Sequence, residues 1–353
     1  MNTPKTGVQI FWKINNMEKK PIVTALLAYG MSGKVFHAPF LTTHNGFELK
    51  AVLERNEKKA VLDHPEIISY SDIDTLLADE TIELVVINTP NFTHFEYAQK
   101  ALLAHKHILI EKPVVTTVEE FKKLQEIALQ VGKQVLAYQN RRWSSDIMAT
   151  KEVIDSGILG EIVEMHLRFD RYRPTIGPKI FKETPVPGSG IWYDLGSHLL
   201  DQALSIFGQP TQHYGYQNKY RTHAQVADYG FMHLIFNTIN VFITTSMLVA
   251  DAQAGIIVHG TKGSFVKDFC DVQETQLSQG MLPTDPKYGI EEAGKEGVLT
   301  LITADGTIQK SKIASKKGAF NQLFDSVFNS IRLGMPYPIT NDQLLKQLEL
   351  LEN

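Results

Sequence analysis

The sequence is short of cysteine, of net charge and of long apolar runs, and each shortage excludes a class of protein. Its one cysteine, Cys270, excludes an intramolecular disulfide and a cysteine-based zinc cluster, and is typical of a reducing compartment. Lys and Arg number 35 against 39 Asp and Glu, which excludes the broad basic surface of an obligate nucleic-acid-binding protein. No segment reaches the roughly 18–20 consecutive apolar residues of a membrane span. We therefore expect a cytoplasmic protein whose partners include neither nucleic acid nor a membrane.

The rest of the composition is that of an ordinary globular protein. Of 353 residues, 43% are hydrophobic and 21% charged, which is enough for a sizeable core. The length predicts two domains or one large domain. Residues 1–20 carry lysines but no long apolar stretch, so we interpret them as an N-terminal extension and not as a secretory signal. We place the two domains at residues 21–142 and 143–353.

In the first domain, short apolar runs alternate with stretches of helical period. The runs predict buried strands at Ile22–Ala28, Glu48–Leu53, Glu83–Asn88, Ile108–Ile110 and Lys133–Tyr138. Helices are expected between them, at Phe95–Ala104 and Val118–Val131. This alternation predicts an α/β fold with a doubly wound parallel sheet, whose ligand crevice lies at the carboxyl ends of the strands.

The second domain has a different pattern, which predicts an α+β fold around an antiparallel sheet. Glu161–Arg173 alternates strictly between apolar and polar residues, as an antiparallel strand with one buried face does. Further strand-like runs are Phe231–Phe236, Val241–Val249 and Gly255–Val266; helices are expected at Lys151–Ser156, Phe320–Leu333 and Asn341–Leu351. We interpret Gln273–Gly297 as a surface excursion.

A glycine-rich turn follows the first strand, and it matches part of a dinucleotide-binding fingerprint. Gly30, Met31, Ser32 and Gly33 occupy the turn, with Ala28 where the fingerprint has its first glycine. Ala fits that position only with a negative φ. A helix starting near Ser32 would present free N–H groups to phosphates. A plain strand–helix turn is the alternative.

Glu54 and Arg55 end the second strand and favour different cofactors. A carboxylate there accepts hydrogen bonds from ribose hydroxyls and favours NAD, whereas a neighbouring arginine pairs with the 2′-phosphate of NADP. We lean slightly to NAD, because a carboxylate would repel that phosphate. A solvated charge pair in a loop is the alternative.

Polar groups also follow the later strands and one helix. The strand-end groups are Thr89, Pro90 and Asn91 with His94, then Glu111 and Lys112, then Asn140 and Arg141. At helical spacing, Asp194, His198 and Asp201 share one face, opposite a leucine-rich arc, and Gly208 ends the helix. An ordinary amphipathic helix is the alternative, but all these segments converge on one sheet edge, where a carboxylate could hold an imidazole as a general base. No histidine–carboxylate set at metal-ligand spacing is present, so we expect no metal.

These motifs together resemble the Gfo/Idh/MocA oxidoreductases, and within them the scyllo-inositol dehydrogenase branch. The runs that carry the resemblance are AYGMSGKVFHAP, TPNFTH, IEKP, QNRRW, FDRYRP and GSGIWYDLGSHLLDQ. The resemblance implies an N-terminal Rossmann domain, a C-terminal domain with a large open-faced antiparallel sheet, and a homodimer or homotetramer. It also implies hydride transfer between a nicotinamide and a secondary hydroxyl of a cyclitol or sugar.

The resemblance also assigns roles to particular residues. Lys112 matches the lysine between nicotinamide and substrate, Asp194 and His198 match the proton-transfer pair, and Asn140, Arg141 and Trp192 lie where substrate contacts are found. Two other functions stay open: a sensor that binds NAD(P) and sugar without turnover, and a dehydrogenase of another aldose or polyol.

Overall fold

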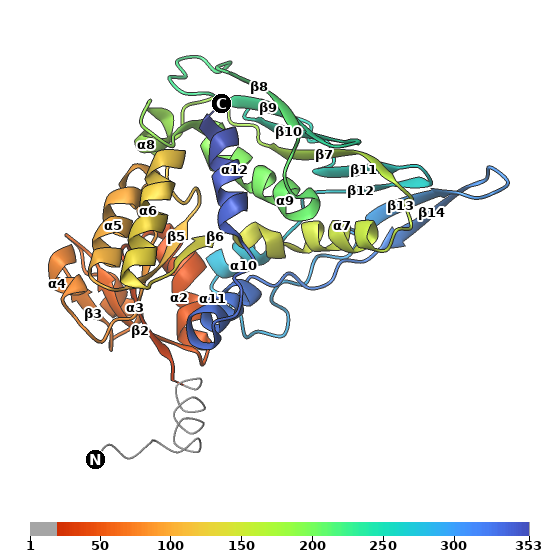
Figure 1. Cartoon of the computed structure of the whole chain (residues 1–353). Helices are drawn as coiled ribbons and strands as arrows, with labels where there is room; N and C mark the ends of the chain where they lie inside the picture. The colour runs from red at the N-terminus through yellow and green to blue at the C-terminus, as the bar shows by residue number, and fades with distance from the viewer. Residues whose placement is uncertain (1–19, 353) are drawn as a thin grey trace, which may run out of the picture.

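The protein contains two β-sheets side by side, each covered by helices (Figure 1). The computed structural model describes residues 20–352, so the expected extension at 1–20 lies, except for Lys20, outside the described residues. Among the described residues, no helix is both long enough and apolar enough to cross a membrane.

The first sheet has six parallel strands in the order β3-β2-β1-β4-β5-β6. They are β1 (Ile22–Leu26), β2 (Phe47–Leu53), β3 (Ile68–Tyr70), β4 (Leu84–Ile87), β5 (His107–Glu111) and β6 (Val135–Tyr138). The chain order runs outward from β1 in both directions, so the predicted doubly wound Rossmann sheet is confirmed. The short strand β3 was not predicted from the sequence.

Alternate residues of these strands enter different cores, one on each face of the sheet. Ala25 and Val85 pack with helices α4 (Ile73–Leu77), α5 (His94–Leu103) and α6 (Val118–Val131). Leu26 and Val86 pack on the other face with α2 (Ala38–Thr43). A sheet covered on both faces requires the near-continuous apolar runs that the sequence shows.

The second sheet has eight strands in the order β14-β13-β12-β11-β7-β10-β9-β8. They are β7 (Ile162–Asp170), β8 (Gln212–Asn218), β9 (Tyr229–Phe236), β10 (Ile239–Ser246), β11 (Ile256–Gly260), β12 (Gly263–Lys267), β13 (Gly297–Ile302) and β14 (Ile308–Ile313). The predicted alternation in β7 is present, with Met165 and Leu167 fully buried. Its predicted antiparallel pairing is correct for β11 and wrong for β10, which runs parallel to it. The sheet is therefore mainly antiparallel, as expected.

Helices cover one face of this sheet and leave the other open. The apolar residues of α7 (Ser145–Asp155) and α9 (Ser197–Phe207) share a core with Met165, Leu234 and Val258 of the sheet. Gly208, with φ 82°, ends α9 as predicted, because this backbone conformation favours glycine. The uncovered face is visible above the helices in Figure 1.

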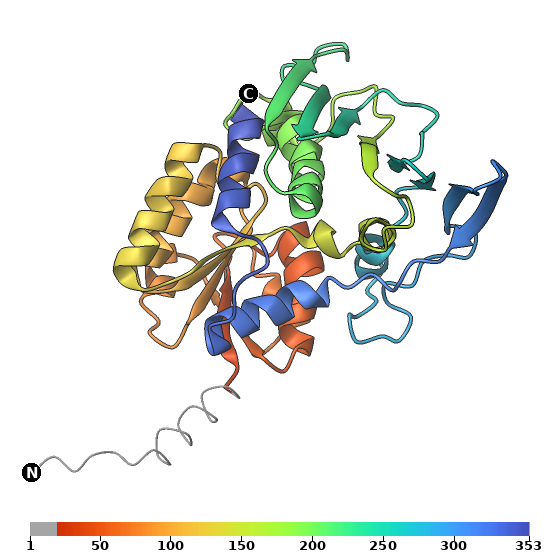
Figure 2. The same ribbon diagram turned by 45° about the vertical axis from the view of Figure 1, so that its right-hand side comes forward.

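The end of the chain returns to the first sheet. Helix α11 (Asn321–Leu333) packs beside α2, as both views show (Figures 1 and 2), and α12 (Asn341–Glu352) lies between the two domains. Within the expected surface excursion, Leu277 of α10 (Gln273–Ser278) and Tyr288 are buried in the same core as α11. The excursion prediction is therefore wrong for these residues, because the segment covers one face of the first sheet.

Candidate active site

The turn after β1 is built for close approach of a phosphate. An added Cβ at Gly33 would lie 2.1 Å from the Ala28 carbonyl oxygen, so only glycine fits there. An added Cβ at Gly30 would meet no atom within 4 Å, which leaves that side of the turn open. Ala28 is not among the described residues with positive φ, as expected. Asn88 fixes the turn by accepting from the Ala28 N–H at 3.0 Å and donating to its carbonyl oxygen at 2.8 Å.

A helical segment starts immediately after the turn, as predicted. Its first part, Ser32–His37, is a π-helix that continues into α2. The first N–H groups of a helix have no partner within it and can therefore bind an anion. The Glu111 carboxylate holds this segment against β5, because it accepts from Ser32 Oγ at 2.7 Å and contacts His37 Nε2 at 3.0 Å. Burial alone would raise the pKa of Glu111, but the His37 and Ser32 contacts and the Lys112 charge outweigh it and lower the pKa.

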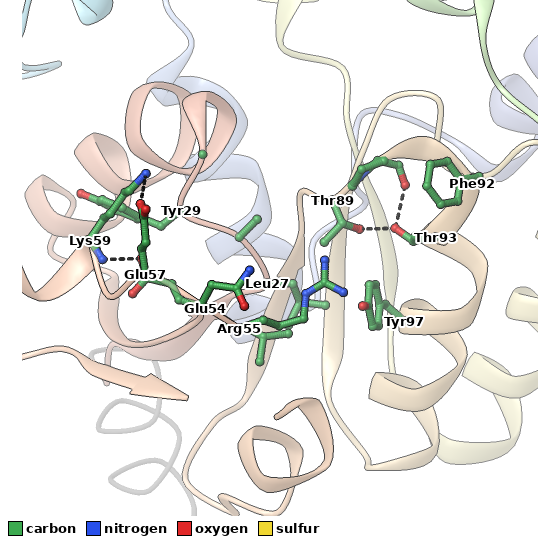
Figure 3. Close-up of a pocket in the computed structure, with 15 residues that line it drawn as sticks. Leu27, Tyr29, Glu54, Arg55, Glu57, Lys59, Thr89, Phe92, Thr93 and Tyr97 are labelled. Atoms are coloured by element: carbon green, nitrogen blue, oxygen red, sulfur yellow. Dashed lines mark hydrogen bonds and ion pairs between the residues drawn. The ribbon is translucent and has the colours of Figure 1, made fainter. Parts of the chain in front are cut away.

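A cavity of about 610 Å³ lies beside this turn (Figure 3). It is lined by Tyr29 and Gly30 on one side, by Thr89 and Pro90 on another, and by the loop after β2. Its volume falls within the range of roughly 300–1,000 Å³ for small-molecule and cofactor sites. The open space at Gly30, the helix start and this cavity together fit a dinucleotide whose adenosine half occupies the cavity.

Glu54 and Arg55 both line the cavity, but the Glu54 carboxylate already has partners within the protein, whereas Arg55 is exposed. The Glu54 carboxylate accepts the backbone N–H groups of Lys59 and Ala60 at 2.8 and 3.1 Å and the Ser69 hydroxyl at 2.7 Å. It is buried and holds the loop before α3 (Ala60–Asp63) in place. Arg55 is exposed and extends towards the Tyr97 side of the cavity (Figure 3). Glu54 thus has a structural role in this loop, and its expected role at the ribose stays a prediction.

The loop after β4 lines the cavity and also contacts neighbouring loops. His94 is fully buried between the carbonyl oxygens of Thr89 and Pro113, both 2.9 Å from its ring nitrogens, so it braces the loops and does not face the cavity. Burial lowers the pKa of His94. Asn91 donates to the Gly188 carbonyl oxygen at 2.7 Å and thus joins this loop to the second domain. Met31 is exposed at the phosphate turn.

The reactive residues from the two domains meet at the Asp194 carboxylate. Lys112, after β5, donates to the Asp194 carbonyl oxygen at 2.7 Å and lies 3.3 Å from its Oδ1. Lys182 donates to the same Oδ1 at 2.7 Å, and an Arg171 nitrogen lies 4.0 Å from Oδ2. Burial alone would raise the pKa of Asp194, but these cations outweigh it and hold the pKa well below its usual value. Asp194 therefore stays ionised.

His198 lies beside this cluster in a neutral form. It is 8% exposed, and its Nδ1 has no hydrogen-bond partner among the described residues. Burial, and next the charges of Lys112 and Arg141, hold the pKa of His198 well below its usual value. The expectation that Asp194 orients the imidazole is wrong in this structure, because the carboxylate contacts Lys112 and Lys182 instead. A π-helical segment, Trp192–Gly196, precedes α9 and changes the spacing on which that expectation relied.

The three expected substrate residues have different surroundings. Arg141 pairs with Glu274 at 2.7 Å and stacks over Phe169, close enough to affect His198. Asn140 is buried at the start of the 3-10 turn Asn140–Trp143, which follows β6. Trp192 is 1% exposed and its indole N–H donates to the Leu350 carbonyl oxygen at 3.3 Å. The substrate role expected of Trp192 is therefore wrong, since its ring is part of the second core.

Asp201 was expected on the polar face of the same helix, but it forms a buried ion pair. Its two oxygens accept from Arg142 Nε and Nη2 at 2.8 and 2.7 Å. The sequence reasoning also missed Arg171 and Lys182 as members of the reactive cluster. Arg171 could have been found, because it directly follows β7, whereas nothing in the local pattern marks Lys182.

Fold and site together define a class of protein: a two-domain oxidoreductase that uses a nicotinamide dinucleotide. A model described as an oxidoreductase family with an NAD-binding Rossmann fold matches residues 23–139. The model of the GFO/IDH/MocA C-terminal domain matches residues 147–266. The chain belongs to the Gfo/Idh/MocA family and is an NAD(P)-dependent oxidoreductase.

Relatives cover nearly the whole chain. An uncharacterized oxidoreductase of Schizosaccharomyces pombe, C115.03, is 37% identical over 94% of this chain and 96% of its own length. The scyllo-inositol 2-dehydrogenase (NADP(+)) IolW of Bacillus subtilis is 30% identical over 94% of this chain and 92% of its own. The crystal structure of an oxidoreductase from Bacillus cereus superimposes with a TM-score of 0.87 at 30% identity, covering 94% of this chain and 95% of that one.

Proposed function

We propose that the protein oxidises a secondary hydroxyl of a cyclitol or sugar, similar to scyllo-inositol, and reduces the corresponding ketone in the reverse direction. The observation that supports this most is the contact of Lys112, from the first domain, with Asp194 of the second domain, beside His198. The relationship to an inositol dehydrogenase at 30% identity supports the same class of substrate.

In the proposed reaction, the chain supplies a base and a hydrogen-bond donor. The low pKa of His198 leaves its imidazole neutral and able to accept the hydroxyl proton. The Lys112 ammonium donates to the same oxygen and stabilises its developing negative charge, an effect worth about 3–4 kcal/mol for one preorganised donor. Asp194 fixes the position of that ammonium. The bound nicotinamide supplies the hydride acceptor.

We propose NADP as the preferred cofactor, in place of the initial lean to NAD. The argument for NAD rested on the Glu54 carboxylate, whose oxygens already accept three hydrogen bonds from the protein. Arg55 is exposed in the cavity and offers a guanidinium for the 2′-phosphate. We expect Arg55→Ala to raise the KM for NADP by roughly tenfold or more and to leave the KM for NAD nearly unchanged. An equal effect on both cofactors would contradict this assignment.

The activity is tested by following nicotinamide absorbance with NAD and NADP against a panel of inositols and aldoses. Lys112→Ala and His198→Ala should each lower turnover by roughly 10²–10⁴ while cofactor binding persists. Wild-type turnover in either variant would reject the role given to that residue. Binding of cofactor and sugar without turnover by the wild-type protein would favour a sensor.

We also propose that the open face of the second sheet joins two copies of the chain. A row of aromatic and imidazole rings crosses adjacent strands on this face: Tyr214, His233, Phe242 and His166, with neighbouring ring centroids 4.4–6.1 Å apart. Such a row on an uncovered face suits a second copy, because a two-fold axis places like surfaces against each other. Light scattering should give a dimer or tetramer at micromolar concentration, and a clean monomer would reject this.

A further inference from the structure

We propose, building on the function above, that the substrate carries a carboxylate or a phosphate, and that Arg171 and Lys182 bind this group. The reacting molecule would then be a sugar acid or a phosphorylated polyol, and the anionic group would lie close to the reacting hydroxyl. The proposal rests on the arrangement of charges around Asp194.

The Asp194 carboxylate forms ion pairs with three cations at this site. Lys182 is 2.7 Å and Lys112 3.3 Å from Asp194 Oδ1, and Arg171 is 4.0 Å from Oδ2. The side chains of Lys112 and Asp194 are 15% and 19% exposed, so water screens these charges only partly. Partly buried charges of like sign need a counter-charge.

Arg171 is the cation with the weakest partner. Its side chain is 27% exposed and stacks over the Phe169 ring at 5.3 Å. Among residues 20–352 its guanidinium makes no hydrogen bond, and its ion pair with Asp194 spans 4.0 Å. Burial, opposed by the Asp194 charge, lowers the pKa of Arg171. A guanidinium has five N–H donors suited to carboxylate and phosphate oxygens, so an acceptor from a ligand would complete this site.

The other cations near the site have closer carboxylate partners than Arg171 does. Arg141 lies near His198 and is paired with Glu274. The charge of Arg141 also favours the ionised forms of Asp146 and Asp271, and that of Lys112 favours the ionised form of Glu111, so these two cations have further carboxyl groups nearby. An oxidised nicotinamide ring beside Lys112 would add a further positive charge. A neutral polyol leaves the Arg171 guanidinium with its long ion pair to Asp194, whereas an anionic substrate gives it a hydrogen-bonded partner of opposite charge.

Lys182 is held in position by its neighbours. It belongs to the short helix α8 (Ile180–Glu183), which lies above the first domain in Figure 1. The Glu183 carboxylate accepts from Arg221 at 2.8 Å, and Arg221 in turn pairs with Asp228 at 3.1 Å. The Arg221 side chain is 3% exposed. This buried network fixes α8 and places the Lys182 ammonium at the reactive cluster.

The test compares neutral substrates with their acidic counterparts, using the full-length protein and both cofactors. The pairs are glucose with glucuronate, glucose with glucose 6-phosphate, and myo-inositol with its monophosphate; the glucuronate and phosphate arms tell the two anionic groups apart. In the wild-type protein, kcat/KM should be about 10- to 100-fold higher for an acidic member than for its neutral partner. Arg171→Gln and Lys182→Gln should each lower this ratio, mainly through KM, and Arg171→Lys should retain more of it. Lys151→Gln, on the exposed face of α7 where Lys151 pairs with Asp155, removes a charge outside the site and should retain the whole ratio.

Equal kcat/KM for both members of every pair, or an unchanged ratio in Arg171→Gln, would overturn the proposal while leaving the dehydrogenase assignment intact. If no sugar is oxidised, calorimetric binding of glucuronate and inorganic phosphate decides. Binding that is lost in Arg171→Gln would support the anion site, while the absence of turnover would reject sugars and cyclitols as the substrate class. Absent or unchanged binding would overturn the anion site.

Discussion

Removal of the Asp201 carboxylate should destabilise the protein strongly. Asp201 and Arg142 are 5% and 10% exposed, and they form two hydrogen bonds of 2.7 and 2.8 Å. Breaking a buried ion pair from one side costs about 3–5 kcal/mol, because the remaining charge stays buried. In Asp201→Asn, Arg142 loses its counter-charge and one of the two oxygens at position 201, and keeps the other oxygen, the Pro338 carbonyl oxygen and Gln343 Oε1 as acceptors. With a urea m-value of about 3 kcal/mol/M, the unfolding midpoint should fall by about 1–1.7 M.

A double-mutant cycle isolates the pair itself. Arg142→Met should destabilise by a similar amount, because it leaves a buried carboxylate unpaired. The double variant has no buried charge, so its loss of unfolding free energy should be about 1–3 kcal/mol smaller than the sum of the single losses. Circular dichroism at increasing urea measures all four proteins. Additive losses, or an unchanged midpoint in Asp201→Asn, would show that the pair contributes nothing and that this reasoning is wrong.

Three further perturbations have expected outcomes of known sign. Gly33→Ala should reduce soluble yield or unfolding free energy because its Cβ would collide with the Ala28 carbonyl oxygen; Gly30→Ala, with open space around it, should fold normally and weaken cofactor binding measured by fluorescence titration. Because the pKa of His198 is well below 6.5, its imidazole stays neutral as the pH falls through 6.5. The kcat/KM for alcohol oxidation should therefore not fall with an apparent pKa near 6.5. A fall in kcat/KM there would contradict a neutral, buried base. Burial, and next the neighbouring Asp271, raise the pKa of Asp146 from 3.8 to about 6. Between these two pH values the folded state binds a proton that the unfolded state has lost. The free energy of unfolding should therefore fall as the pH rises from about 4 to 6. Asp271→Asn should flatten that slope in urea titrations at each pH.

The sequence predicted most of the fold but only part of the site. Helix α6 has the predicted bounds, Val118–Val131, because an amphipathic period and a following glycine are local signals. Parallel strands buried on both faces are equally visible as apolar runs. The short strand β3 and the exposed strand β8 lack such runs and were missed.

The partners of polar side chains could not be predicted, because the tertiary structure decides which nearby or distant group each side chain contacts. Glu54 is used by Lys59, Ala60 and Ser69, and Asp201 by Arg142, from 59 positions away. The spacing of Asp194 and His198 suggested a pair, but the carboxylate is occupied by lysines from two other segments. Residue type and position in the sequence located the reactive centre. The hydrogen bonds and ion pairs within it depend on the tertiary structure.

The last helices have a consequence for how the protein is made. Leu344 and Leu348 of α12 enter the core of the first domain, Leu350 and Leu351 enter that of the second, and α11 covers the opposite face of the first sheet. The nucleotide-binding half therefore cannot close either of its cores until α11 and α12 have been synthesised and have docked. A nascent chain that still lacks these two helices exposes apolar surface on both faces of the Rossmann sheet.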